Sequence, residues 1–239
     1  MRTVAIVQAR MGSSRLPGKV LADVAGQTML ARVLGRLAAA DLVTETVVAT
    51  TNSAHDAAIV AEAARLGVAA ICGSETDVLA RYLAAARAAN ADVIVRVTAD
   101  CPLLDPHVVD LVIEACTTEV DYASNTHTRS YPRGLDVEAL HRDTLERIAR
   151  LGTSPSAREH VTAFVMAEPA LFRIRQVRAS SDDSDLRWTV DTDEDLAMVR
   201  DVYGLVGDDL VPYREVVALV RARPALAARN AGVAQKAWR

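Results

Sequence analysis

The sequence has little of what identifies several large classes of protein. Its 239 residues include three cysteines, which form no CxxC pair and no metal-binding spacing with the five histidines, so a disulfide framework or a zinc site is not expected. No apolar run approaches the roughly 18 residues of a membrane-spanning helix, and the N-terminus lacks the pattern of a signal peptide. The formal net charge of −4 argues against nucleic acid as the main partner. These absences predict a cytoplasmic protein that binds neither nucleic acid nor a membrane.

Aromatic residues are also scarce, at 4%, whereas the hydrophobic fraction is 51%. This composition suits helices packed closely on a sheet through small side chains. In the first half, apolar strand patterns alternate with helical patterns. The expected strands are residues 4–8, 46–50, 68–72 and 93–98, and the expected helices cover 27–39, 105–116 and the stretches that begin near Ser53 and Thr76. The alternation predicts an α/β fold with a mostly parallel sheet covered by helices on both faces.

The second half has a less regular pattern. We expect one helix over residues 157–167, two strands over 171–177 and 187–190 that form a small antiparallel element, and helices over 193–202 and 213–220. No linker separates these segments from the first half, so residues 1–220 are expected to form a single domain. Residues 221–239 are rich in alanine and arginine and are expected to form a C-terminal tail or helix that could be flexible.

The most informative segment is a basic loop directly after the first strand. Residues 8–19 read QARMGSSRLPGK and contain three cations and two glycines, a composition that can hold a polyphosphate. The segment is not a Walker A loop, because five residues separate Gly12 from Gly18 and Val20 follows Lys19. It is not the G-x-G-x-x-G pattern either. A plain basic surface loop is the alternative interpretation.

Two aspartates at the ends of expected strands are candidate ligands for a divalent cation. Asp100 follows the strand over 93–98, and Asp191 follows the one over 187–190. Mg²⁺ prefers one or two carboxylates together with phosphate oxygens and water. In parallel sheets, ligands bind outside the carboxyl ends of the strands, where the basic loop, residues 72–77 and residues 98–102 are all expected to lie. The sequence therefore predicts one crevice that holds Mg²⁺ and a polyphosphate.

These segments match a known family. The basic loop over 8–19, Thr98-Ala99-Asp100-Cys101-Pro102, Arg158-Glu159-His160-Val161-Thr162 and Val190-Asp191-Thr192 together resemble the cytidylyltransferases. The branch most similar is that of the spore coat polysaccharide biosynthesis protein F, and the synthetases of CMP-sugar acids are more distant. The resemblance implies a nucleotide-diphospho-sugar transferase fold, Rossmann-like, in which 1–220 is a nucleotidyltransferase domain. It also implies Mg²⁺-dependent transfer of CMP from CTP to a sugar or other small acidic acceptor, release of pyrophosphate, and a homodimer.

The resemblance assigns roles to particular positions. Arg15 and Lys19 match the cations that bind the triphosphate, and Asp100 and Asp191 match the two metal-binding acids; Arg15, Lys19 and Asp100 are therefore the expected catalytic residues. The sugar-acid synthetases usually carry proline where Gln8 stands and an acidic residue where Cys101 stands. The identity of the acceptor is consequently not implied by the resemblance.

Further residues are candidates for contacts with the two substrates. Backbone groups of Ala9 and of residues 73–77 are expected to contact the base and the ribose, and polar residues in irregular stretches of the second half are expected to contact the acceptor. Arg133, beside a glycine, suggests a carboxylate or phosphate on that acceptor. The candidates for nucleotide binding are Gln8, Ala9, Arg10, Gly12, Ser13, Gly73 and Asp77. The candidates for acceptor binding are Asn125, Arg133, Asp136, Glu138 and His160. Asp77 could equally cap the helix that begins there, Arg133 could belong to a plain surface turn, and a lone histidine on a helix is more often structural.

Three other functions fit the same residues. A glycosyltransferase that uses a nucleotide-sugar donor shares the fold type and would not release pyrophosphate from CTP. A non-catalytic nucleotide-binding protein would keep its role after Asp100→Asn. A nucleotidyltransferase that uses another NTP would share the chemistry but not the base.

Overall fold

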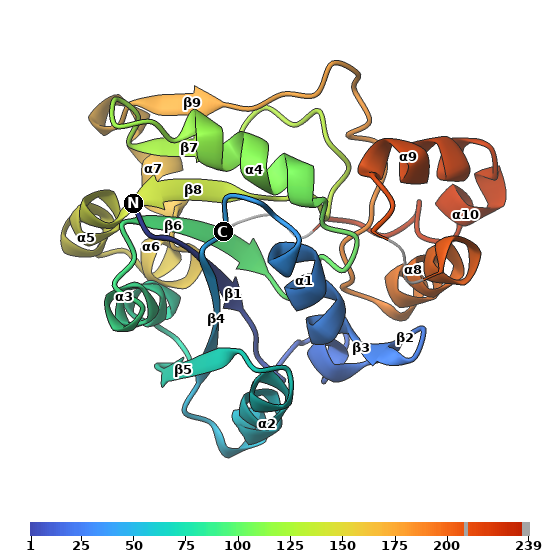
Figure 1. The fold of residues 1–239 in the computed structure, drawn as a ribbon, viewed down its shortest axis with the longest axis horizontal. Helices are drawn as coiled ribbons and strands as arrows, with labels where there is room; N and C mark the ends of the chain where they lie inside the picture. Colours follow the sequence, from blue (N-terminus) through green and yellow to red (C-terminus); the bar gives the residue numbers. More distant parts are fainter. Residues whose placement is uncertain (208–209, 236–239) are drawn as a thin grey trace.

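A seven-stranded sheet forms the centre of the molecule, which we describe from a computed structural model over residues 1–207 and 210–235 (Figure 1). The strand order is β5-β4-β1-β6-β8-β7-β9, and β8 alone among these strands runs antiparallel to its neighbours. The strands span Thr3–Gln8 (β1), Glu45–Thr51 (β4), Ala69–Gly73 (β5), Val93–Thr98 (β6), Tyr122–Ser124 (β7), Glu138–His141 (β8) and Ile174–Gln176 (β9). The mostly parallel sheet predicted from the sequence is confirmed.

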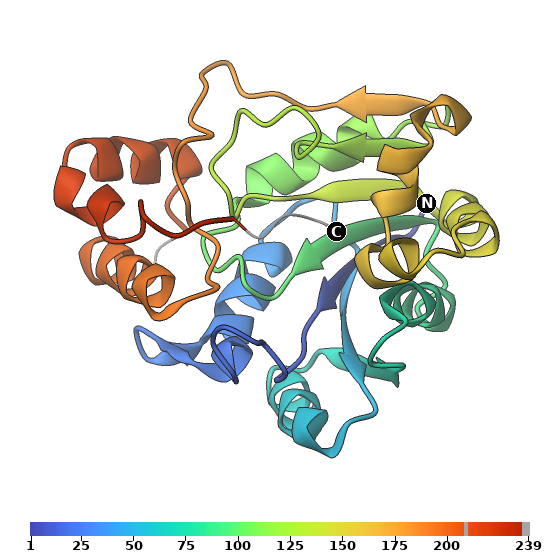
Figure 2. The ribbon, with the colours of Figure 1, turned by 180° about the vertical axis from the view of Figure 1, so that it is seen from behind.

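Helices cover both faces of this sheet, and their apolar sides form two separate cores. One face carries α1 (Met29–Ala38), α2 (Ala57–Arg65) and α4 (Pro106–Ala115), and the other carries α3 (Val78–Ala88), α5 (Arg142–Leu151), α6 (Pro155–His160) and α7 (Ala163–Ala167). Figure 1 shows α1 and α4 in front of the sheet, and Figure 2 shows α3, α5 and α6 in front of it from behind. Alternate residues of β1 supply the two cores, since Ala5 and Val7 face one and Val4 and Ile6 face the other.

The C-terminal part forms a third cluster beside the sheet, at the right of Figure 1. It contains α8 (Asp193–Val206), α9 (Tyr213–Arg221) and α10 (Pro224–Ala228), which pack on Trp188 and on the two-stranded hairpin β2 (Asp23–Val24) and β3 (Gln27–Thr28). Three short 3-10 helices complete the described elements: η1 (Lys19–Leu21), η2 (Ala54–Asp56) and η3 (Pro169–Leu171). Within the described ranges, no helix combines the length and the apolar character that crossing a bilayer requires.

Side chains cap the starts of two of the expected helices. The Asp77 carboxylate caps α3 by accepting from the amide of Ala80 (2.9 Å), which is one of the two roles that the sequence left open for it. The Ser53 hydroxyl caps η2 by accepting from the amide of His55 (3.3 Å).

The second half contains further corrections. The helix expected over 157–167 is two helices, α6 and α7, because Val161 between them has a φ of 54°. The strand within 171–177 is β9, which pairs parallel to β7, and residues 187–190 form no strand. Arg187 instead makes an isolated parallel bridge with Arg133. The antiparallel pairing expected between these two segments is therefore wrong.

The order of the central strands determines where a crevice opens at the edge of the sheet. The chain runs outward from β1 through β4 to β5, then returns to place β6 on the other side of β1. Gln8, the last residue of β1, pairs with Thr98, the last residue of β6. Adjacent strands whose connections leave in opposite directions open a crevice at their carboxyl ends. The basic loop and Asp100 therefore lie next to each other, directly after the ends of β1 and β6.

Candidate functional site

A crevice of about 230 Å³ lies at the carboxyl ends of β1 and β6. Its lining comes from the basic loop, from the segment after β6 and from Asp191. The lining residues are Gln8, Ala9, Arg10, Ser13, Ser14, Arg15, Lys19, Val20, Thr98, Ala99, Asp100 and Asp191. Residues that are distant in sequence, and that were singled out for their chemistry, therefore share one cavity.

The basic loop is held in a folded turn. The carbonyl of Met11 accepts hydrogen bonds from the amides of Ser13 and Gly18, both at 2.9 Å. Gly18 has a φ of +73°, a conformation that glycine adopts without a steric cost, and η1 begins at the next residue. This turn directs Lys19 back toward β6.

Asp56 fastens the loop to the sheet. Its carboxylate accepts from the amide of Met11 (2.7 Å) and from the hydroxyl of Thr51 at the end of β4 (2.5 Å). Asp56 is 2% exposed, so these bonds are shielded from water. No local pattern in the sequence predicts this contact, because it joins residues 45 positions apart.

Lys19 lies between the two candidate metal ligands. Its Nζ donates to Asp100 Oδ2 (2.8 Å), to Asp191 Oδ1 (2.8 Å) and to the carbonyl of Val190 (2.7 Å). The amide of Val190 in turn donates to the carbonyl of Asp100 (2.9 Å), which brings Asp191 to the end of β6 without a strand. Arg15 completes the cluster, with Nη2 2.7 Å from Asp191 Oδ2. The two cations of the basic loop and the two aspartates therefore form one cluster, as the interpretation of the sequence requires.

The charges of this cluster stabilise each other. Burial alone would raise the pKa of the Asp100 carboxyl, but the charge of Lys19 and hydrogen bonds from Lys19 and Thr98 outweigh it and lower that pKa. Burial opposes protonation of Lys19 as well, yet the two carboxylates raise its pKa. Both groups are therefore ionised at neutral pH.

Asp191 is held in place by a hydrogen-bond network that was not predicted from the sequence. Arg187 donates through Nη2 to Asp191 Oδ2 (2.9 Å) and through Nε to Asp195 Oδ1 (2.8 Å). Asp195 is completely buried and also accepts from Nδ2 of Asn230 (2.8 Å). A signal was available in the sequence, because Thr192 and Asp195 form a capping box that starts α8 directly after Asp191.

The C-terminal tail reaches the same cluster. Asn230 is 4% exposed and also donates to the carbonyl of Arg187 (3.0 Å). Arg15 donates to the carbonyl of Ala234 (3.3 Å), and Arg187 donates to Oε1 of Gln235 (2.6 Å). The tail expected over 221–239 thus contains α10 and a segment that contacts the crevice; its last four residues, 236–239, lie outside the described ranges.

The candidates for nucleotide binding divide into two groups. Gln8, Ala9, Arg10 and Ser13 line the crevice. The remaining three are not in its lining: Gly12, Gly73 and Asp77.

The segment over residues 73–77 is held by its own contacts. A Cβ added to Gly12 would lie 3.9 Å from Oε1 of Glu75, so the loop borders this segment. A Cβ at Gly73 would lie 2.8 Å from Cγ of Arg81. Besides capping α3, Asp77 accepts from Nε of Arg158 (3.0 Å). Its carboxylate therefore has the structural role that was one of the two alternatives open from the sequence.

Two of the five candidates for acceptor binding serve the scaffold, which corrects those two assignments. Asn125 is buried and links the backbone of Leu135 and Val137. Glu138, 3% exposed, accepts from Arg96, Tyr122 and Thr162 beneath the sheet. Neither side chain has an oxygen available to a ligand.

The other three candidates differ in their surroundings. Asp136 pairs with Arg129 through both carboxylate oxygens (2.5 and 2.8 Å). His160 ends α6, on the same face of the sheet as α3, and is not in the lining of the crevice. Arg133 lines a second cavity next to Arg187.

Asp100 and Asp191 fit Mg²⁺ better than they fit a metal ion whose ligands are all protein side chains, because Mg²⁺ also takes ligands from phosphate and water. The described ranges contain no group of three or more histidine, cysteine, aspartate or glutamate side chains arranged to hold a metal ion. Asp100 and Asp191, however, each place an oxygen 2.8 Å from the same Lys19 nitrogen. Two carboxylates that share one cation, beside a crevice open to phosphate and water, match the ligands that Mg²⁺ prefers.

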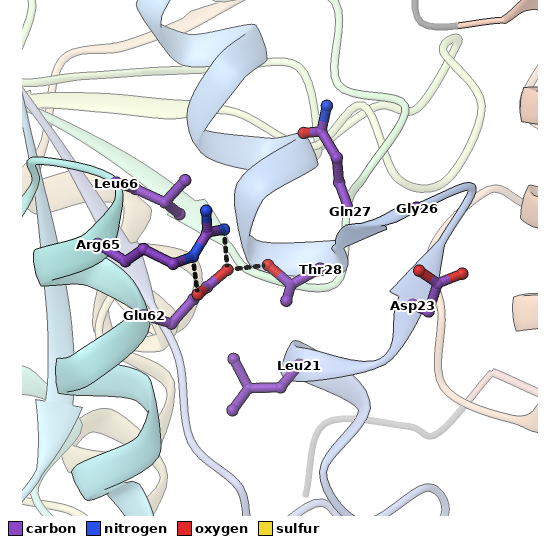
Figure 3. Close-up of a pocket in the computed structure, with 8 residues that line it drawn as sticks. All are labelled: Leu21, Asp23, Gly26, Gln27, Thr28, Glu62, Arg65 and Leu66. Carbon is purple, nitrogen blue, oxygen red and sulfur yellow. Dashed lines mark hydrogen bonds and ion pairs between the residues drawn. The ribbon is translucent and has the colours of Figure 1, made fainter.

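A larger cavity of about 560 Å³ lies away from these residues, between the β2–β3 hairpin and α2 (Figure 3). Its central carboxylate, Glu62, accepts from Thr28 (2.6 Å) and from two nitrogens of Arg65 (2.7 and 2.8 Å). These bonds fasten the hairpin to α2 and occupy the carboxylate. None of the candidate residues from the sequence lines this cavity.

Comparison with known proteins gives one consistent result. A family model described as cytidylyltransferase matches residues 4–210. The spore coat polysaccharide biosynthesis protein SpsF of Bacillus subtilis is 31% identical over 92% of this chain and 94% of its own length. A 3-deoxy-manno-octulosonate cytidylyltransferase of Trichlorobacter lovleyi is 41% identical over 48% of this chain and 44% of its own. The solved structure of a cytidylyltransferase from Leptospira borgpetersenii covers all of both chains with a TM-score of 0.93 and 30% identity.

Proposed function

The chain belongs to the cytidylyltransferase family, and we propose that it transfers CMP from CTP to a sugar or other small acidic acceptor, with release of pyrophosphate and dependence on Mg²⁺. The single observation that carries the proposal is the Lys19 ammonium 2.8 Å from both Asp100 and Asp191, with Arg15 on the same aspartate. A homodimer and a cytoplasmic location remain predictions from the sequence.

The cations are the residues that would bind the triphosphate. Arg15 and Lys19 lie on one side of the crevice and present a guanidinium and an ammonium to it. Transfer of a nucleotidyl group places negative charge on the departing pyrophosphate, so catalysis depends mainly on positioning and charge stabilisation. Fixed by the folded loop, these two groups can stabilise that charge without rearranging the backbone.

Asp100 and Asp191 would hold the metal. Once bound there, Mg²⁺ would draw charge from the phosphate oxygens and lower the pKa of the acceptor hydroxyl. The protein's own contribution is to keep both carboxylates ionised and in place. The Lys19 charge keeps Asp100 ionised, and the hydrogen bond from Arg187 holds the Asp191 carboxylate in place.

Gln8 is a candidate for choosing the base. It lines the crevice, and its side-chain oxygen is buried without a donor in the described part of the chain. The exocyclic amino group of cytosine is such a donor, whereas uracil has a carbonyl at the same position. A buried acceptor left without its donor is costly, so this contact would favour CTP over UTP.

On this proposal, the acceptor is a sugar or a derivative of a sugar. The relative named as a spore coat polysaccharide biosynthesis protein matches nearly the whole chain. Its name supports a product used in polysaccharide synthesis, but does not specify the acceptor.

Nucleotide binding and pyrophosphate release test the proposal. With MgCl₂ present, we expect CTP to bind more tightly than UTP, GTP or ATP, and Gln8→Leu to reduce that preference. With CTP and a panel of sugar acids that includes 3-deoxy-manno-octulosonate, pyrophosphate should appear, and EDTA should abolish it. Asp100→Asn should slow release about 10²–10³-fold. The exposed Glu114→Gln serves as the control and should match the wild type. Failure of CTP to bind, or unchanged release by Asp100→Asn, would refute the proposal.

A further inference from the structure

A second cavity, of about 310 Å³, lies directly behind the Asp191 cluster. Residues 184–188 and Arg133 form one wall, and α10 with the following segment forms the other. The two cavities are neighbours, because Arg187 lines the second and donates to Asp191, which lines the crevice. Arg15, from the crevice, contacts Ala234, whose neighbours Val233 and Gln235 line the second cavity.

Arg133 brings an unpaired charge to this cavity. Two other arginines of the lining are paired, Arg187 with Asp191 and Asp195, and Arg221 with two aspartates of the 183–185 segment. The guanidinium of Arg133 has no hydrogen bond or ion pair with any residue in 1–207 or 210–235. Burial and the charges of Arg129 and Arg187 lower its pKa, and they outweigh the opposing charge of Asp136. A half-buried cation beside other cations is destabilised until an anion binds to it.

Trp188 lies beneath the surface of the cavity. It is completely buried, and its indole Nε1 has no hydrogen-bond partner among the residues described. A donor without accessible surface cannot reach a ligand in the cavity, so Arg133 is the lining donor that the inference uses.

The backbone holds Arg133 and Trp188 together rigidly. The amide of Arg133 donates to the carbonyl of Leu186 (2.9 Å), and its carbonyl accepts from the amides of Trp188 (2.6 Å) and Thr189 (3.1 Å). Gly134 permits this approach, because its φ is +105° and a Cβ there would lie 2.6 Å from backbone atoms of Trp188 and Thr189. The same stretch of chain ends at Asp191, so the position of Arg133 is fixed relative to the crevice.

We infer that this cavity binds the acceptor of the proposed reaction, and that Arg133 binds a carboxylate or phosphate group of that acceptor. The inference rests on the proposed function. Carboxylates and phosphates present oxygens in the geometry that a guanidinium recognises. A volume of about 310 Å³ is within the range of small-molecule sites. The C-terminal segment, which lies beyond the part matched by the family model, then forms one wall of the acceptor site.

Calorimetric titration of the full chain, saturated with CMP, tests the inference. Three sugars of equal ring structure serve as probes: glucuronate carries a carboxylate, glucose 6-phosphate carries a phosphate, and glucose carries neither. We expect at least one anionic sugar to bind and glucose not to bind. The stronger of the two anions identifies the group that Arg133 recognises. Arg133→Gln should weaken that binding at least about tenfold, as expected for loss of a charged hydrogen bond, and Arg133→Lys should recover part of it.

Two controls separate the possible failures. Arg178→Gln removes an exposed arginine outside the cavity lining and should bind as the wild type does. Unchanged CMP affinity in Arg133→Gln shows that the variant is folded. Equal anion binding by wild type and Arg133→Gln, equal binding of glucose, or no anion binding despite CMP binding would overturn the inference alone. Failure of the wild type to bind CTP in the presence of MgCl₂, measured in a separate titration, would refute the proposed function, and the acceptor assignment with it.

Discussion

Replacing Lys19 by methionine removes the cation that Asp100 and Asp191 share while keeping a side chain of similar length. The exposed fractions of the three side chains are 12%, 24% and 18%, so the two ion pairs are intermediate between surface and buried pairs. Surface pairs contribute about 0–1 kcal/mol, and breaking a buried pair costs about 3–5 kcal/mol. Without Mg²⁺, Lys19→Met should therefore lower the free energy of unfolding by about 1–3 kcal/mol.

Asp100 should carry most of this loss. Asp191 keeps Arg15 and Arg187 as partners, whereas Asp100 keeps only neutral donors such as the Thr98 hydroxyl. Burial, now unopposed by the ammonium, should raise the pKa of Asp100. In the wild type, the lowered pKa of Asp100 contributes stability that is lost as the pH falls, whereas a raised pKa in the variant makes its folded state gain stability on acidification. The difference in stability between the two proteins should therefore narrow as the pH is lowered.

Denaturant unfolding with and without MgCl₂, together with the pyrophosphate assay, measures the effect. If Mg²⁺ binds the two carboxylates, it should stabilise Lys19→Met more than the wild type, because the competing ammonium is gone. Adding Asp100→Asn to the variant should remove this difference. Turnover should fall about 30–1,000-fold, corresponding to about 2–4 kcal/mol of lost transition-state stabilisation. Equal stability, or equal stabilisation of wild type and variant by Mg²⁺, would refute the reasoning.

Other perturbations test the scaffold. Gly134→Ala should destabilise the fold by about 2 kcal/mol or more in denaturant unfolding, because its Cβ would meet backbone atoms of Trp188; an unchanged midpoint would contradict the contact. Hydrogen bonds from Arg173 are the main reason that the pKa of Asp121 falls from 3.8 to about 2, so Asp121 stabilises the fold above pH 3.8 and loses this effect as the pH falls toward 2. Asp121→Asn should cost about 1–2 kcal/mol at pH 7 and almost nothing near pH 2, and a difference independent of pH would contradict it. Cys72 is exposed and the other two thiols are buried, so Ellman's reagent should modify one thiol per folded chain, and faster labelling of a second would contradict the burial.

The central fold could be predicted because its strands carry a local signal. The strand expected over residues 93–98 is β6 as found, since β-branched residues fill a position buried on both faces. Parallel strands then place their carboxyl ends at one edge, which is why the loop before Lys19 and the residue Asp100 could be placed together from sequence alone. Asp191 reaches the same edge by a different route from the one expected. Its segment is no strand, but hydrogen-bonds to the end of β6 through Val190.

The acceptor residues could not be predicted so well because their roles depend on partners distant in sequence. Glu138 was chosen as a polar residue in an irregular stretch, yet it lies in β8 and accepts from Tyr122 and Thr162. Nothing local distinguishes such a buried carboxylate from one that binds a ligand. The same holds for Asn230, which lies 35 residues from Asp195 in sequence and yet bonds to it.

The pairing of charges within the crevice explains why CTP and Mg²⁺ are proposed as joint ligands. Lys19 and Arg15 can turn toward a triphosphate only by leaving carboxylates that they now neutralise. Asp100 would then be a partly buried carboxylate without an ionic partner, which is costly unless another cation replaces the ammonium. A divalent cation that arrives with the phosphates supplies that replacement. Binding of CTP and binding of Mg²⁺ should therefore be coupled, and each should strengthen the other by the same factor.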